Sequence, residues 1–169
     1  MKKADLLIAH TQGVYTIKVD GRANFECSPP IRNLANNLDK DLQKISIDLT
    51  GCSGMDSTFM GVLAMLGLQT RNKAVVEIVN AGTENRHLLE GLGIQSLFSF
   101  VEKTAGGQPE AHWSRPEAKA DAVDRAETVY TAHDTLIRAN ETVNRPKFEK
   151  VVEFAKKDLD KLKKEQEKQ

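Results

Sequence analysis

The sequence predicts an α/β fold that carries a helical extension at its C-terminal side. Over residues 1–103, strand-like runs alternate with stretches whose apolar residues recur at helical spacing. Such alternation is typical of a mixed, largely parallel sheet with crossover helices. The composition changes at Lys103, and two more helical patterns follow. We therefore expect an α/β domain over 1–103, a linker over 104–113, and an α-helical hairpin over 114–169.

The first strands form a predicted hairpin. Apolar runs at 6–9 and 14–19 are separated by Gln12-Gly13, a turn pair that suits a tight reversal. The segment Gly21–Phe25 follows as a turn, in which Asn24 is expected to tolerate an unusual φ. Ser28 then precedes two prolines, which predicts a helix start capped by Ser28. The apolar face of this helix comprises Ile31, Leu34, Leu38 and Leu42.

The central stretch combines a strand, a loop and a helix start. Residues 45–49 alternate between apolar and polar side chains, as in a half-buried strand, and the glycine-containing segment 50–55 predicts a loop. Asp56-Ser57-Thr58 has the chemistry of a helix N-cap, and an apolar helix follows. Because a helix N-terminus favours anions, Ser57 is a hydroxyl at a position that can accept a phosphate.

The remaining elements complete the order β-β-α-β-α-β-α-β. The β-branched run 74–79 predicts a buried strand, and a helix begins at Thr83 and Glu84. A last short strand is expected within residues 94–101.

Two helices are expected in the extension. Ser114 and Glu117 fit a capping box for a helix that runs to Asn140, and a second helix restarts near Asn144 with Pro146 in its first turn. The charged end of the second helix is expected to fray. Its apolar stripe should pack on the α/β domain or form a homodimer contact; it comprises Phe148, Val151, Val152, Ala155, Leu159 and Leu162.

Composition narrows the function classes. The 169 residues carry a formal net charge of zero, which gives no basic field for nucleic acid. Apolar runs are too short for a membrane span, and the start of the chain does not resemble a signal peptide. Two cysteines are too few for a disulfide scaffold. We expect a cytoplasmic protein without membrane insertion.

The segment IDLTGCSGMDSTFMGVLAML resembles the central motif of STAS domains of the anti-sigma factor antagonist type. That motif is an apolar strand ending in Asp-Leu, a short loop, then Asp-Ser-(Ser/Thr)-x-x-Gly opening an apolar helix. In the family the serine after the aspartate is phosphorylated by a partner kinase, and this serine corresponds to Ser57. The family commonly has glycine where this chain has Phe59, which alters the expected docking surface. The turn Gly21-Arg22-Ala23-Asn24 is similar to the family's turn beside the phosphorylated serine, so Asn24 is expected to contact the partner.

The resemblance implies a bacterial, phosphorylation-controlled anti-anti-sigma factor that regulates transcription by partner switching. Its partners would be an anti-sigma factor or serine kinase with a histidine-kinase-like ATP-binding fold, and a serine phosphatase. ATP would belong to the kinase, and no cofactor or metal is expected in this chain. The expected phosphorylation site is Ser57, and the expected partner-binding residues are Asn24, Asp56, Ser57, Thr58, Phe59 and Met60.

Several alternatives stay open. Ser57 and Asp56 could serve only as helix caps, and Thr58 could be a second phosphorylation site or the end of the cap. One of Phe59 and Met60 is expected to point outward, the alternative being that both lie in the core. The whole chain could instead be a non-switching STAS scaffold or a transport-associated interaction module, or an α/β domain that binds a small anionic ligand at a helix N-terminus.

Catalysis has little support in the sequence. The four histidines are scattered without metal-ligand spacing, and Cys52 has no adjacent base that would activate its thiol. The pair Gly51 and Gly54 is not followed by the Gly-Lys-Ser/Thr of a phosphate-binding loop. We therefore expect a regulatory protein and no enzymatic activity.

Overall fold

The computed structural model describes residues 4–104, 112–116 and 120–169. These residues form a five-stranded sheet with the order β1-β2-β3-β4-β5. The first two strands pair antiparallel, and every later pair is parallel. The predicted mixed, largely parallel sheet is therefore confirmed. The strands are β1 (Asp5–Thr11), β2 (Val14–Ala23), β3 (Lys44–Met55), β4 (Val75–Val79) and β5 (Ser99–Val101).

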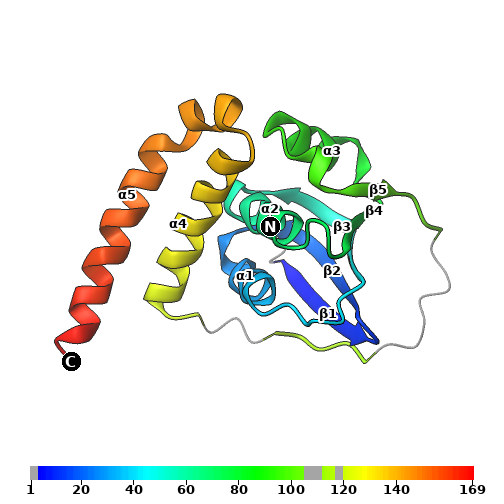
Figure 1. Ribbon diagram of the computed structural model, residues 1–169, viewed down its shortest axis with the longest axis horizontal. Helices are drawn as coiled ribbons and strands as arrows, with labels where there is room; N and C mark the ends of the chain where they lie inside the picture. Colours follow the sequence, from blue (N-terminus) through cyan, green and yellow to red (C-terminus); the bar gives the residue numbers. More distant parts are fainter. Residues whose placement is uncertain (1–3, 105–111, 117–119) are drawn as a thin grey trace.

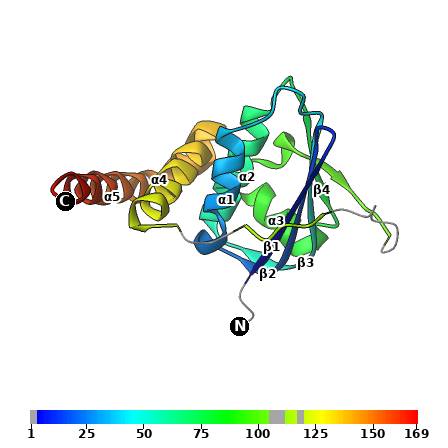
Figure 2. The ribbon, with the colours of Figure 1, turned by 90° about the horizontal axis from the view of Figure 1, so that it is seen from below.

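Crossover helices connect the parallel strands, and the chain ends in two longer helices (Figure 1). Seen along the sheet, the helices lie to one side of the strands (Figure 2). The α-helices are α1 (Pro29–Asn36), α2 (Ser57–Gln69), α3 (Gly82–Gly91), α4 (Ala122–Ala139) and α5 (Glu141–Glu167), and short 3₁₀ helices span η1 (Phe25–Cys27) and η2 (Gln95–Leu97). None of the helices in the described ranges is long and apolar enough to cross a membrane.

The core lies between the sheet and the helices. In β3 the apolar side chains of Ile45, Ile47 and Leu49 are almost completely buried. The alternating residue Ser46 instead donates a hydrogen bond to Glu77 of β4. This alternation is the period-two pattern that the sequence showed, because successive side chains of a strand point to opposite faces.

Helix α2 is apolar around most of its circumference and buried along nearly its whole length. A helix of this kind must be covered on more than one side. The sheet lies on one side of α2, α1 lies beside α2 on the same face of the sheet, and α4 packs against α2 on the side away from the sheet (Figures 1 and 2). The C-terminal extension therefore belongs to the layer that buries α2.

Three expectations for the first half of the chain are wrong in detail. Residues 50–55 are not a loop, because β3 continues to Met55 and pairs with β2 through irregularities in register. Ser28 does not cap α1; its hydroxyl donates to the carbonyl of Asn24 at 2.8 Å. Since α1 ends at Asn36, Leu38 and Leu42 lie beyond the helix, although Leu42 is buried.

The extension begins differently from its prediction. Ser114 pairs with Ile8 at the edge strand β1 through two backbone hydrogen bonds of 2.8 and 2.9 Å, so it does not start a helix. Glu117, the other half of the expected capping box, lies outside the described residues. Helix α4 starts at Ala122 after the N-cap Asp121, whose carboxylate accepts from the amide of Asp124.

Helix α5 starts directly after α4, earlier than expected. Asn140 caps α5 and is the one residue between the two helices, and Pro146 lies inside α5. The helix continues to Glu167, so the expected fraying of its charged end is not observed.

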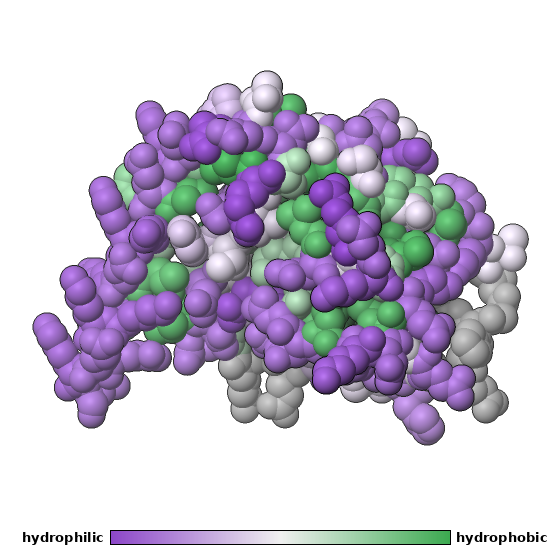
Figure 3. Space-filling view, viewed as in Figure 1, coloured by the Kyte–Doolittle hydropathy of each residue, from purple (hydrophilic) through white to green (hydrophobic). Residues whose placement is uncertain are grey.

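The two-helix extension packs on the α/β part through α4, as expected for one of the two arrangements considered. Helix α5 packs on α4, and its C-terminal end projects away from the body (Figures 1 and 2). The apolar stripe of α5 is only partly covered, because Leu159 is buried whereas Val151 is 37% exposed. The face in Figure 3 is mostly hydrophilic, with polar side chains dividing its apolar patches.

Candidate functional site

Asp56 joins the start of α2 to the segment that follows β2. One carboxylate oxygen accepts from the amide of Phe59 at 2.8 Å, which makes Asp56 the N-cap of α2. The other accepts from the amide of Phe25 at 2.9 Å. The structure thus places the turn containing Asn24 beside the Asp56-Ser57 pair. The capping role considered for Asp56 is confirmed.

Asn24 caps the short helix η1. Its side-chain oxygen accepts from the amide of Glu26 at 3.0 Å, and its φ of −143° is ordinary extended backbone. The expectation that Asn24 adopts an unusual φ is therefore wrong. The residue is half-buried, so it lies at the rim of this region.

Ser57 is the first residue of α2, and its hydroxyl does not serve as the cap. The Oγ atom lies 2.9 Å from Nε2 of His133 in α4, 76 residues further along the chain. The other ring nitrogen, Nδ1, lies 2.7 Å from the carbonyl oxygen of Val129. Because a carbonyl can only accept, Nδ1 carries the proton and Nε2 accepts from the Ser57 hydroxyl. Ser57 is thus the donor in a contact between the α/β part and the extension.

His133 is held in its neutral form by burial. Desolvation lowers the pKa of this side chain, while the Val129 carbonyl and the nearby Asp56 carboxylate act in the opposite direction with smaller effect. The ring of Phe148 from α5 packs against the imidazole with 5.1 Å between ring centroids. Helix α4 therefore contacts the Ser57 hydroxyl directly, and α5 packs behind the imidazole that makes this contact.

Two further contacts fix α4 on this surface. A Cβ atom added to Gly61 of α2 would lie 2.5 Å from the carbonyl oxygen of Ala132, so glycine permits the close approach of the two helices. On α1, the buried guanidinium of Arg32 donates to Asp124 at 2.8 Å and lies 3.3 Å from Glu127. An apolar contact and an ion pair thus flank the Ser57–His133 hydrogen bond.

The three other expected partner-binding residues are buried. Thr58 and Met60 are 5% and 6% exposed, and Phe59 is completely buried. The expectation that Phe59 or Met60 points outward is therefore wrong, and the alternative that both lie in the core is confirmed. The apolar first turns of α2 explain this, because the sheet and α4 cover them from opposite sides.

Sequence reasoning missed His133 and Arg32, the two residues that connect Ser57 and α1 to the extension. Neither carried a motif, and the contact between Ser57 and His133 spans two separately predicted segments. The apolar character of α2 on all sides was the available signal, because it required a second covering element.

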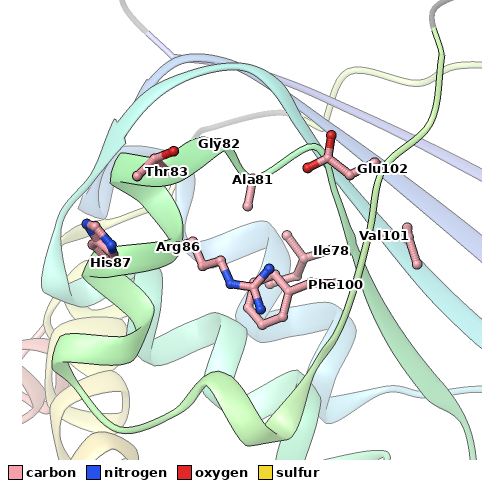
Figure 4. A pocket seen from close by; sticks show the side chains of 9 residues that line it. All are labelled: Ile78, Ala81, Gly82, Thr83, Arg86, His87, Phe100, Val101 and Glu102. Carbon is pink, nitrogen blue, oxygen red and sulfur yellow. The ribbon is translucent and has the colours of Figure 1, made fainter.

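Neither cysteine has an activated thiol. Cys27 and Cys52 are buried free thiols, and burial raises the pKa of both, that of Cys27 to about 11. Among residues 4–104, 112–116 and 120–169, no three His, Cys, Asp or Glu side chains are placed to hold a metal ion. A separate hollow lies between α3 and β5, where the Arg86 guanidinium stacks 4.5 Å from the centre of the Phe100 ring (Figure 4).

Comparison with known families identifies the α/β part. The family model described as the STAS domain matches residues 5–106, more than half of the chain. The chain belongs to the STAS domain family. The match includes Asp56, Ser57 and Gly61 and ends before α4, so the helix that contacts Ser57 lies outside it.

The STAS fold also has solved structural neighbours. The anti-sigma factor antagonist SpoIIAA in its unphosphorylated form is 16% identical with a TM-score of 0.46, over 58% of this chain and 87% of that chain. The Bacillus cell fate determinant SpoIIAA in the phosphorylated form is 14% identical with a TM-score of 0.48, over 59% and 92% of the respective chains. A comparison with curated protein sequences gives no match.

Proposed function

We propose that this STAS protein is a phosphorylation-controlled anti-sigma factor antagonist. With Ser57 unphosphorylated, it binds an anti-sigma factor or serine kinase and so frees a sigma factor for transcription. Phosphorylation of Ser57 releases the partner, and a serine phosphatase restores the binding form. ATP belongs to the kinase, so this chain acts by binding.

The observation that carries the proposal is the position of the Ser57 hydroxyl. It is the hydrogen-bond donor in a helix contact at the start of α2, and Asp56 has taken over the capping of that helix. A phosphate would remove the donated hydrogen and add about 1.5 to 2 negative charges at neutral pH. A surface that fits a neutral hydroxyl at 2.9 Å would reject this group.

The α/β body can accept the same modification. A helix N-terminus stabilises negative charge through its exposed N–H groups and dipole. The cap and the link to Phe25 are made by Asp56, so phosphorylation of Ser57 breaks neither of these bonds. The switch would therefore act on whatever packs against α2 and leave the sheet in place.

The test is a pull-down from native lysate with three forms of the full chain as bait: wild type, Ser57→Ala and Ser57→Asp. We expect wild type and Ser57→Ala to capture an anti-sigma factor or a serine kinase, and Ser57→Asp to lose it. The captured kinase with ATP should add one phosphate to wild type and none to Ser57→Ala, as measured by intact mass. Equal capture by all three baits would contradict the proposal.

A second candidate is a non-switching STAS scaffold or transport-associated interaction module. The hydrogen bond to His133 supports it, because it gives Ser57 a purely structural use in holding the extension. Under this alternative the three baits capture the same proteins, and no kinase modifies Ser57.

A further inference from the structure

The surface around Ser57 accommodates a helix. It is lined by Arg32 of α1 and by Ser57 and Gly61 of α2, and α4 lies across all three. Without α4, the first turns of α2 would expose the apolar side chains that it now covers. An apolar surface of this kind in a soluble domain marks an interaction site.

The residues of α4 define what kind of helix fits. Ala132 is small enough to approach the backbone at Gly61, and His133 accepts from Ser57. Asp124 lies about two turns before Ala132, ~12 Å along the axis, and Glu127 lies about one and a half turns before it; both carboxylates meet the cation of Arg32. The surface therefore selects an amphipathic helix that has a small residue at one position and carboxylates about one and a half to two turns before it.

Resting on the function proposed above, we propose that α4 occupies in cis the surface on which the partner docks, and that a partner helix of the same chemistry displaces it. In this closed form, with α4 packed on α2, His133 engages the Ser57 hydroxyl and α4 occupies the surface that the partner needs. The partner must open the α4–α5 hairpin, which sets a threshold for binding.

Phosphorylation of Ser57 is incompatible with the closed form. The Oγ atom is already in hydrogen-bond contact with His133, and the Gly61–Ala132 contact leaves no space for the helices to move closer together. A phosphate at Ser57 would have to separate α4 from α2. Its charge would also lie beside Asp56, whose carboxylate is fixed by two backbone amides. The phosphorylated chain is therefore open, and its docking surface then carries the charge that rejects the partner.

The hairpin can be opened without changing the docking surface itself. Ala132→Arg places a long cation against the backbone of α2, although Ala132 belongs to α4. The matched control is Ala122→Arg, the same substitution at an exposed position in the first turn of the same helix.

The experiment measures amide hydrogen exchange in the full chain with phosphoserine installed at position 57, in Ala132→Arg, in Ala122→Arg and in wild type. We expect exchange in residues 122–139 to rise roughly tenfold or more in phosphoserine-57 and Ala132→Arg chains, and to stay at the wild-type level in Ala122→Arg. Protection in β3 and β4 should be unchanged, which shows that the body remains folded. Wild-type protection of α4 in the phosphoserine-57 chain, or in Ala132→Arg, would overturn the proposal.

Partner capture provides the second readout. Ala132→Arg should capture several times more of the anti-sigma factor or kinase than wild type or Ala122→Arg, and adding Arg32→Gln should reduce this gain. Equal capture by Ala132→Arg and wild type would overturn the proposal that α4 and the partner compete for the same surface. If no bait captures such a partner, the proposed function fails, while hydrogen exchange still decides whether phosphorylation opens the hairpin.

Discussion

Ser57 at the start of α2 and His133 in α4 share a hydrogen bond of 2.9 Å across the boundary between the STAS domain and its helical extension. The imidazole is oriented by the carbonyl of Val129 and covered by Phe148. The residue that we propose as the phosphorylation site is thus also an anchor of the extension. One hydroxyl therefore links the proposed switch to the position of two helices.

Ser57→Ala should destabilise the fold by about 1–3 kcal/mol, because it leaves the buried Nε2 acceptor of His133 without a donor. Urea unfolding of the full chain measures this change. In a double-mutant cycle with His133→Phe, which keeps a ring against Phe148, the coupling energy should be about 1 kcal/mol. The matched control is Ser53→Ala, at an exposed serine of β3, which should change the stability by less than about 0.5 kcal/mol. A coupling energy of zero would mean that the two side chains do not interact in solution.

Gly61→Ala should destabilise the protein although alanine is the better helix former. The added Cβ would lie 2.5 Å from the carbonyl oxygen of Ala132, and backbone cannot rotate away as a flexible side chain can. We expect the clash to exceed the gain in helix propensity of about 1 kcal/mol and to leave a net loss of roughly 1–3 kcal/mol.

Gly91→Ala is the control for this substitution, because a Cβ at Gly91, the last residue of α3, meets nothing within 4 Å. It should be neutral or slightly stabilising in the same urea titration. If Gly61→Ala were as stable as Gly91→Ala, α4 would not approach α2 as closely as described.

Arg32→Gln should cost more stability than an equivalent change at an exposed ion pair. The Arg32 side chain is 8% exposed and pairs with two carboxylates of α4, so its loss removes charge-assisted bonds from a partly dry interface. We expect a loss of about 1–2 kcal/mol, since Asp124 and Glu127 are exposed enough to be solvated once unpaired.

Arg138→Gln is the matched control on α4 itself, because the Arg138 side chain is 66% exposed and pairs with Asp134 four residues earlier. This pair should be worth less than about 0.5 kcal/mol. Equal effects of the two substitutions, measured by chemical denaturation in the same buffer, would indicate that Arg32 does not hold α4.

Much of the fold could be predicted from local patterns. The alternation in β3, the turn pair Gln12-Gly13 and the cap chemistry before α2 each depend on a few neighbouring residues, and Gln12 and Gly13 both have positive φ. The ends of the strands and helices were less predictable. Strand β3, for example, extends through Gly51 and Gly54 because pairing with β2 outweighs the turn preference of glycine.

The site could be predicted only in part. Asp56 and Ser57 were found because the cap and the phosphorylation motif are local. His133 and Arg32 act through α4, and no periodicity reveals which helix face will meet a hydroxyl so far away in the chain. Ser114 shows the same limit, since its pairing with Ile8 at the edge of the sheet overrode a sequence that suited a helix cap.

The stability that His133 provides should depend on pH. Burial lowers the pKa of His133 from its ordinary value near 6.5, so the folded chain favours the neutral ring and the unfolded chain binds a proton first. The stabilisation that the neutral His133 ring provides is therefore complete above about pH 6.5. It is lost as the pH falls from there through the lower pKa of the folded state. The difference in unfolding free energy between wild type and His133→Gln should shrink between pH 7.5 and pH 5. A difference that grew on acidification would mean that the charge of Asp56, which favours the protonated ring, outweighs burial.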